Sequence, residues 1–429
     1  MRDLETRPPA ILLGADTPIG LTVIRELGEH GVPVHAIARS REGIGLYSKW
    51  TTARYIRPLD DDATIALLNR IATEHGARFL LGVSERDLHF IRSAADSARL
   101  PGLKALVPSA DKLAVVGDKL ATYAVAKEVG IPLAATWQPP AGHEPGEPPQ
   151  DLGFPCILKW SNPEEVQRWL ADRNIAWLKA EYCYDRYELR RSLARYQPLG
   201  RYPLVQAFCP GTGLGHMIFL DQGKALLRLQ HRRVAEWPPE GGTSTVCESL
   251  PLSVNASLFS KSEALLRRIG WQGAAMVEYR FDRQTGKTAL MEVNGRFWGS
   301  LPLAYHAGTP FAWYTYAVLG LGERPSLPPY RAGIRCRYMI PETRRVAALM
   351  RHGGRTQNRA LSFSVLHESL EYLRQFFGLK SRYYVLTLGD PLPFFVDLVF
   401  AAARACRRLR QRRRQQMAHA RMVGTAKAQ

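Results

Sequence analysis

Short apolar segments alternate with amphipathic ones through the first hundred residues. The apolar runs at residues 10–14, 32–38 and 78–82 have the length and composition of buried strands. Between them, residues 19–29 and 63–74 repeat apolar positions every three or four residues, which is the spacing of a helix face. Strands that alternate with helices predict a parallel sheet covered by helices.

A second set of segments follows residue 110. Asp118 begins a helical pattern that runs to about residue 130, and residues 154–159 form a buried strand that ends in a lysine. Residues 202–211 predict a strand that breaks at Pro-Gly, a hinge whose backbone can hydrogen-bond the edge of an adenine.

Two acidic residues come together in a predicted hairpin. Residues 274–281 and 287–293 are short apolar-rich segments joined by the turn-forming sequence Asp-Arg-Gln-Thr-Gly, so they should pair as antiparallel strands. This pairing brings Glu278 near Glu292. Asn294 shares a strand face with Glu292, while the valine between them points into the core.

Two carboxylates and an amide oxygen suit Mg²⁺, which phosphates and water usually complete. Arg296 reaches the same face and would neutralise charge on a transferring phosphoryl group. The alternative is a pair of solvated acids at a hairpin end, with Asn-Gly as an ordinary turn.

Arginines also mark a predicted substrate loop. Residues 225–230 form an apparent strand, and residues 231–245 leave it as a loop rich in proline and glycine. Arg232 or Arg233 could hold a substrate carboxylate with two hydrogen bonds. The alternative is a mobile loop with solvated arginines.

The order of these motifs resembles that of the ATP-grasp superfamily of ATP-dependent carboxylate ligases. The resemblance covers about residues 10–310 and is closest to the carbamoyl-phosphate-synthase-like, carboxylate-amine ligase branch. Its most specific part is Asn-Gly-Arg-Phe-Trp-Gly-Ser, which begins at Asn294.

The resemblance implies an α/β and α+β fold in three parts. A Rossmann-like N-terminal lobe, the pre-ATP-grasp domain, would span residues 1–110, and a two-lobed ATP-grasp domain residues 111–325. A mainly helical C-terminal extension with a basic tail would span residues 326–429.

The resemblance also implies ATP with Mg²⁺, or Mn²⁺ in its place, and a role for each matching residue. Lys119 and Lys159 would contact the ATP phosphates. The adenine hinge would be Gln206, Ala207 and Phe208, with Ala207 acting by its backbone. Glu278 would bind one metal ion, Glu292 would bridge two, Asn294 would complete the second, and Arg296 would lie on the γ-phosphate or acyl phosphate.

The chain departs from the family pattern twice. Family members often follow the second lysine with a glycine-rich loop over the phosphates, yet residues 160–165 contain no glycine. Ala207 also replaces the acidic residue that is common at the hinge, which leaves no assigned ligand for the ribose.

The reaction expected from this site is phosphoryl transfer to a carboxylate, followed by attack of an amine on the acyl phosphate. No Gly-x-Ser-x-Gly nucleophile elbow accompanies the motifs, which disfavours a covalent enzyme intermediate. An NAD-dependent oxidoreductase is disfavoured because the turn from Gly14 to Gly20 lacks the G-x-G-x-x-G spacing. A carboxylate kinase without the amine step and a non-catalytic ATP-binding module remain open.

The net charge of +19 is concentrated toward the C-terminus. Residues 398–429 carry eight arginines, one lysine and no acid. Just before them a helical pattern gathers apolar side chains on one side, namely Phe395, Val396, Val399, Phe400 and Ala403. Residues 391–421 could lie on an anionic membrane surface, or form a docked helix with a solvated basic end. Nucleic acid fits less well, because no known reader motif accompanies the charge.

Six widely spaced cysteines give neither a zinc spacing nor a disulfide framework, and the first apolar run is too short for a secretory signal. A cytoplasmic protein is expected, peripheral at the cytoplasmic face of a membrane if the tail binds lipid. Residues 343–352 and 363–377 predict two helices without an assigned role, and the aromatic cluster at residues 311–316 is expected in the core. The oligomeric state is not predicted.

Overall fold

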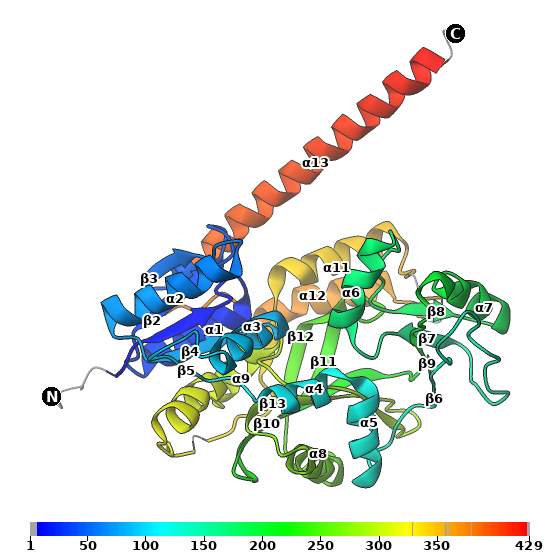
Figure 1. Cartoon of the computed structure of the whole chain (residues 1–429). Coiled ribbons are helices and arrows are strands. Elements are labelled where there is room, and N and C mark those ends of the chain that lie inside the picture. The colour runs from blue at the N-terminus through cyan, green and yellow to red at the C-terminus, as the bar shows by residue number, and fades with distance from the viewer. Residues whose placement is uncertain (1–6, 328, 357, 360, 379, 427–429) are drawn as a thin grey trace.

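Three sheets organise the chain in the computed structural model (Figure 1). It describes residues 7–327, 329–356, 358–359, 361–378 and 380–426. The mixed α/β architecture predicted from the sequence is confirmed, with one parallel sheet, two largely antiparallel sheets and a helical C-terminal region.

The N-terminal sheet is parallel throughout, in the order β3-β2-β1-β4-β5. Its strands are β1(Ala10–Leu13), β2(Val34–Ala38), β3(Thr51–Ile56), β4(Phe79–Gly82) and β5(Lys104–Ala105). The helices between them are α1(Pro18–Glu29), η1(Ile44–Tyr47), α2(Asp61–His75) and α3(Glu85–Asp96). The strands β1, β2 and β4 and the helices α1 and α2 fall where the apolar pattern predicts them.

A tight turn joins β1 to α1. Gly14 has φ +101°, and a Cβ there would lie 2.2 Å from a methyl carbon of Val83. A Cβ on Gly20 would lie 2.2 Å from the carbonyl oxygen of Gly14. Both glycines are therefore needed for the close approach of strand and helix.

The central sheet has seven strands in the order β14-β13-β10-β11-β12-β15-β16. They are β10(Thr212–Asp221), β11(Lys224–Trp237), β12(Thr243–Leu250), β13(Gly273–Phe281), β14(Thr288–Asn294), β15(Arg335–Arg337) and β16(Ser381–Tyr383). The helices α4(Ala110–Gly117), α5(Lys119–Glu128) and α8(Ala256–Ile269) precede or interrupt these strands in the chain. The predicted hairpin is confirmed as β13 and β14, which pair antiparallel.

The sequence prediction was wrong for residues 231–237, which we expected to start a loop. They continue β11 and pair with β12, with register shifts on either side of Ala235. The Pro/Gly composition ends the strand only after Trp237, because β12 supplies hydrogen-bonding partners up to that point.

A smaller lobe carries a four-stranded antiparallel sheet in the order β6-β9-β7-β8. Its elements are β6(Thr136–Trp137), β7(Cys156–Lys159), α6(Pro163–Asp172), β8(Glu181–Cys183), α7(Arg186–Ala194), η2(Gln197–Leu199) and β9(Leu204–Ala207). This lobe has its own apolar core, which includes Leu158, Trp160 and Val205.

The C-terminal region is mainly helical, as predicted, but it also completes the central sheet. Its helices are α11(Met339–Arg351), α12(Val365–Arg374), η4(Gln375–Phe377) and α13(Leu392–Ala426). β15 and β16 were not predicted, and they form the outer edge of the central sheet beside β12.

One apolar core joins the N-terminal sheet to the central sheet. It combines side chains of β1, β2 and β4 with Met217, Leu229 and Trp298. The segment α9(Leu301–Ala307), α10(Phe311–Tyr314) and η3(Thr315–Leu321) fills it. The expected burial of the aromatic cluster is confirmed, since Phe311, Trp313, Tyr314 and Tyr316 are all buried.

A buried ion pair fixes the start of α13 to the N-terminal lobe. The carboxylate of Asp390 accepts from Arg25 Nε at 3.0 Å, from the Ser48 hydroxyl at 2.7 Å and from the Lys49 amide at 2.9 Å. The side chains of Arg25 and Asp390 are only 3% and 4% exposed. From this anchor α13 projects away from the rest of the chain (Figure 1).

Candidate active site

The hairpin β13–β14 places two carboxylates opposite each other. Glu278 pairs in register with Glu292, and Asn294 follows two residues later on the same face. Oε1 of Glu292 accepts from the Asn294 amide at 3.1 Å, while Val293 is buried on the other face. The convergence predicted for these three residues is therefore present.

Two lysines approach the carboxylates from different elements. Lys119 is the first residue of α5, and its Nζ lies 3.7 Å from Oε2 of Glu292. Lys159 ends β7 in the smaller lobe, and its Nζ lies 3.9 Å from the sulfur of Met291. Asp118 links the two elements, because its carboxylate caps α5 and accepts from the Ser161 hydroxyl at 2.7 Å.

Arg233 reaches the same site from β11. It donates to Glu278 at 2.6 Å and to Glu236 at 3.0 Å. Glu236 also accepts from Arg280 at 3.2 Å, so one carboxylate holds two guanidinium groups.

Arg232 does not join this cluster. Neighbouring residues of a strand point to opposite faces, and the register between β11 and β12 is regular at Arg232 and Arg233. Arg232 instead donates to Glu248 at 3.0 Å, and Arg335 shares that acceptor at 3.1 Å. Of the two arginines predicted for substrate binding, the structure brings only Arg233 to the carboxylates.

Arg296 connects the hairpin to the N-terminal lobe. Its Nε lies 3.2 Å from the carboxylate of Glu85, the first residue of α3, and its guanidinium also donates to the Phe297 carbonyl at 3.1 Å. Arg296 therefore lies where the β13–β14 hairpin meets the carboxyl-terminal edge of the N-terminal sheet.

The predicted hinge lies at the end of β9. The Gln206 amide is buried and donates to Tyr123 and Thr136. The N–H groups of Ala207 and Phe208 donate to the carbonyls of residues 135 and 155, at 2.8 Å and 3.0 Å. An adenine contact at Ala207 would therefore use its carbonyl oxygen.

The surroundings shift the pKa values of the two glutamates in opposite directions. Burial raises the pKa of Glu292, but Lys119, the Asn294 amide, Lys179 and Arg296 together outweigh it and hold that pKa at about 2. Burial also raises the pKa of Glu278, against the effect of Arg233, and the negative charge of Glu292 raises it further. Glu292 is thus the firmly ionised carboxylate of the pair.

Three contributing residues were not predicted from the sequence. Lys179 lies in the loop before β8 and acts on the charge of Glu292, yet no motif surrounds it. Glu236 reaches the face of Arg233 only because strand irregularities interrupt the alternation near Ala235. Arg280 could have been identified, since it is two residues from Glu278 on the same strand.

The donor set suits a hard divalent cation. Glu278 and Glu292 offer carboxylate oxygens, and Asn294 can offer its amide oxygen because its NH₂ group faces Glu292. No cluster of three or more His, Cys, Asp or Glu side chains arranged for a metal occurs among the described residues. A metal here would therefore need phosphate oxygens or water to complete its coordination.

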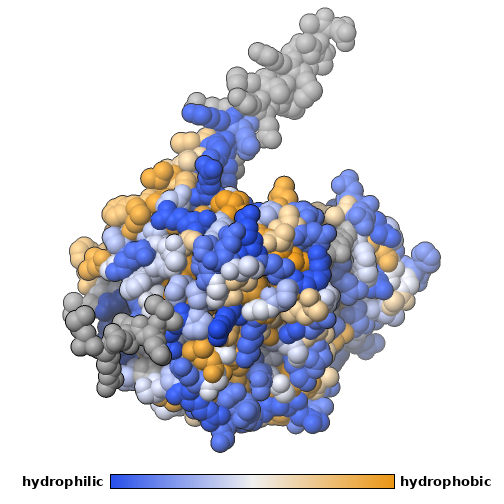
Figure 2. All heavy atoms as spheres, turned by 60° about the vertical axis from the view of Figure 1, so that its left-hand side comes forward, coloured by the Kyte–Doolittle hydropathy of each residue, from blue (hydrophilic) through white to orange (hydrophobic). Residues whose placement is uncertain are grey.

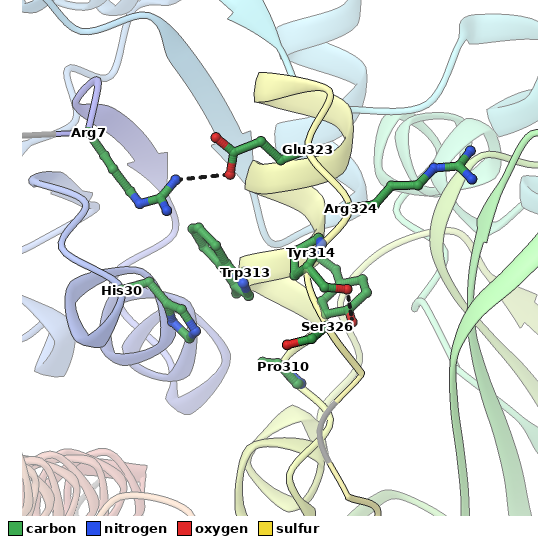
Figure 3. A pocket seen from close by; sticks show the side chains of 9 residues that line it. Arg7, His30, Pro310, Trp313, Tyr314, Glu323, Arg324 and Ser326 are labelled. Atoms are coloured by element: carbon green, nitrogen blue, oxygen red, sulfur yellow. Dashed lines mark hydrogen bonds and ion pairs between the residues drawn. The ribbon is translucent and has the colours of Figure 1, made fainter. Parts of the chain in front are cut away.

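A groove of about 650 Å³ lies elsewhere, between the N-terminal lobe on one side and α10 with residues 323–326 on the other (Figure 3). The Trp313 ring lies between the Arg7 guanidinium, 4.6 Å from the ring centroid, and the His30 ring, stacked at 4.2 Å. Arg7 also pairs with Glu323 at 3.2 Å. The groove contains none of the predicted site residues, and side chains of the protein itself already cover its main aromatic ring.

The chain is similar to several proteins of known function. Mouse mitochondrial pyruvate carboxylase is 22% identical over 314 residues, which are 69% of this chain. The chain thus corresponds to only 26% of that much longer protein. No protein-family model matches the chain.

Solved structures share the fold. Biotin carboxylase from Campylobacter jejuni has a TM-score of 0.59 and 15% identity, covering 77% of this chain and 75% of its own. L-amino acid ligase from Bacillus licheniformis has a TM-score of 0.53 and 18% identity, covering 72% of both chains. The ADP complex of N5-carboxyaminoimidazole ribonucleotide synthetase has a TM-score of 0.58 and 10% identity, covering 85% and 96%.

Proposed function

We propose that the chain, which has the ATP-grasp fold of these enzymes, is an ATP- and Mg²⁺-dependent ligase that joins a carboxylate to an amine and releases ADP and phosphate. The observation that carries the proposal is the composition of the cluster. Two facing glutamates are surrounded by six cationic side chains, namely Lys119, Lys159, Lys179, Arg233, Arg280 and Arg296.

The excess of positive charge suits a polyanion. The three carboxylates of Glu236, Glu278 and Glu292 leave a surplus of cationic groups, and a triphosphate would balance it. Lys119 and Lys159 would hold the phosphates, and Lys179 would approach them from the loop that follows α6. This loop would take the place of the glycine-rich lid that the sequence lacks.

Glu278, Glu292 and Asn294 would hold Mg²⁺, which would draw negative charge from the transferring phosphoryl group. An oxygen of the substrate carboxylate would then attack the γ-phosphorus, and the bond to ADP would break. The amine nitrogen would attack the resulting acyl phosphate, losing a proton as phosphate leaves. Positioning and charge stabilisation supply the catalysis expected of such a site.

Arg233 and Arg296 would bind the reacting anions. A metal ion on Glu278 would replace Arg233 there and free that guanidinium for a phosphoryl or carboxylate group. Arg296 would face an acyl substrate between the hairpin and the N-terminal lobe. Because ATP, Mg²⁺ and reduced thiols occur together in the cytoplasm, we place the reaction there.

Product analysis tests the proposed reaction. The protein, ATP, Mg²⁺ and a panel of carboxylic acids and amines should give ADP, phosphate and an adduct whose mass equals acid plus amine minus water. Formation of AMP and pyrophosphate would contradict the acyl-phosphate route. If ADP forms with an acid alone and no amine gives an adduct, the protein is a carboxylate kinase. If no ATP is turned over with any acid or amine, the protein is a non-catalytic ATP-binding module.

The two neighbouring arginines of β11 give a matched comparison. We expect Arg233→Met to lower kcat/KM by about a hundredfold, because it removes a cation beside the reacting phosphate. Arg232→Met should leave kcat/KM almost unchanged, since Arg232 pairs with Glu248 on the opposite face. Steady-state kinetics of both variants will measure the difference, and equal losses would refute the assignment.

The pH dependence should reveal Lys159. Burial lowers the pKa of Lys159 to about 8 in the free protein. Lys159 is cationic below that pH and neutral above it, so kcat/KM for MgATP should fall as the pH rises through about 8. Lys159→Arg keeps its charge and should remove this limb of the profile, whereas a limb that survives the substitution would assign it to another group.

A further inference from the structure

One face of α13 is apolar and exposed close to the body of the protein. Leu392, Phe395 and Val399 are 51%, 57% and 65% exposed, and their spacing places them on the same side of the helix. Leu388, just before the helix, is 95% exposed. Figure 2 shows apolar side chains gathered where α13 leaves the body. We call Leu388, Leu392, Phe395 and Val399 the apolar face.

The other side of the same turns is anchored. Asp397 is buried, and the Phe400 ring lies 6.0 Å from the Tyr47 ring of η1. Arg404 donates to Glu42 at 2.9 Å. With Asp390 bound at the start of the helix, these contacts hold α13 in one orientation, so the apolar face is a fixed surface of the molecule. The sequence pattern had placed Phe395 and Phe400 on one face, and the structure separates them.

Positive charge follows directly after the apolar face. Arg407, Arg408 and Arg410 are exposed, and the sequence from residue 398 to residue 429 contains no acid. Glu42 of the N-terminal lobe pairs with Arg404 and Arg407, and the next described arginines, Arg408 and Arg410, are exposed to a partner. An apolar face that continues into clustered arginines is complementary to a surface with anionic groups above hydrocarbon.

We propose that the apolar face and the arginines after it dock the protein on an anionic lipid bilayer. The apolar side chains would enter the region between headgroups and acyl chains, and the arginines would bind the lipid phosphates. Among the described residues, the length and hydropathy of every helix fall short of what a membrane span needs. The inference is independent of the proposed ligase activity.

Vesicle flotation with the full chain tests this docking. The protein should float with phosphatidylcholine vesicles that contain phosphatidylglycerol, and high salt or pure phosphatidylcholine should weaken the binding strongly. The double variant Phe395→Ser/Val399→Ser should bind at least about tenfold more weakly, because it removes two inserted side chains. Arg408→Gln/Arg410→Gln should bind more weakly at low salt and lose part of the salt dependence.

Helix α12 offers a matched control. Leu366 and Leu370 are 71% and 56% exposed there, at helical spacing and with Glu368 and Glu371 near them. Leu366→Ser/Leu370→Ser should leave vesicle binding at the parent level. An equal loss of vesicle binding in this control variant would overturn the proposal. Vesicle binding that does not depend on lipid charge, or no vesicle binding by the parent protein, would overturn it as well. A shift from dimer to monomer in Phe395→Ser/Val399→Ser, without vesicle binding by the parent, would assign the face to self-association instead.

Discussion

Replacing Glu292 by glutamine should lower turnover by about a thousandfold, equivalent to about 4 kcal/mol of transition-state stabilisation. Of the two facing glutamates, Glu292 is the one whose surroundings lower its pKa, to about 2, so it would offer a full negative charge to a divalent cation over the whole working pH range. Glutamine keeps the shape and loses that charge. Glu278 alone would leave the cation with one carboxylate in place of two.

The rate of ADP release with saturating Mg²⁺ measures this effect. Glu248→Gln is the matched control, since Glu248 also pairs with arginine on the central sheet but on the opposite face. It should retain most of the activity. Turnover by the Glu292 variant at the parent rate would remove the metal site from the mechanism and with it the proposed reaction.

Removing the Asp390 carboxylate should destabilise the protein by about 3–5 kcal/mol, because Asp390→Ala leaves the buried Arg25 guanidinium without its counterion. Ser48 and the Lys49 amide would lose their acceptor as well. The loss should be seen as a shift of the urea midpoint at an unchanged slope.

Two comparisons make the stability prediction specific. Glu147→Ala breaks the exposed pair with Arg190 and should cost less than about 1 kcal/mol. The double variant Arg25→Met/Asp390→Ala should lose less than the sum of the single variants, because removing both charges leaves no unpaired cation. Additive losses would show that the pair contributes no coupling.

The sequence was sufficient for the parts of the fold that depend on local patterns. The alternation of apolar runs and helices predicted the parallel sheet, and two short segments around a turn predicted the β13–β14 hairpin. Because side chains alternate along a strand, the facing of Glu278 and Glu292 also followed from that pairing. The strands β15 and β16 could not be predicted, since three residues each carry no periodic signal and their pairing is non-local.

The positions of the candidate site residues, whose roles remain predictions, could be inferred to a similar extent. Lys119, Lys159 and the hairpin residues lie in strands and caps with recognisable sequence signals. Arg232 and Arg233 point to opposite faces because β11 continues past Gln230. The proline- and glycine-rich sequence that follows predicted a loop there instead. Lys179 acts through space from a loop, and only the folded chain shows its proximity to Glu292.

The distribution of lysines and carboxylates between separate sheets has a kinetic consequence. Lys159 belongs to the smaller lobe, while Glu278 and Glu292 belong to the central sheet and attract it, against the repulsion of Lys119 and Arg280. Nucleotide entering first would place its phosphates between the lysines of the two lobes, remove the repulsion between these cations and draw the lobes together. The carboxylic acid, which accepts the phosphoryl group, would then meet a site already assembled, so initial-rate and product-inhibition patterns should follow an ordered scheme in which ATP precedes the acid.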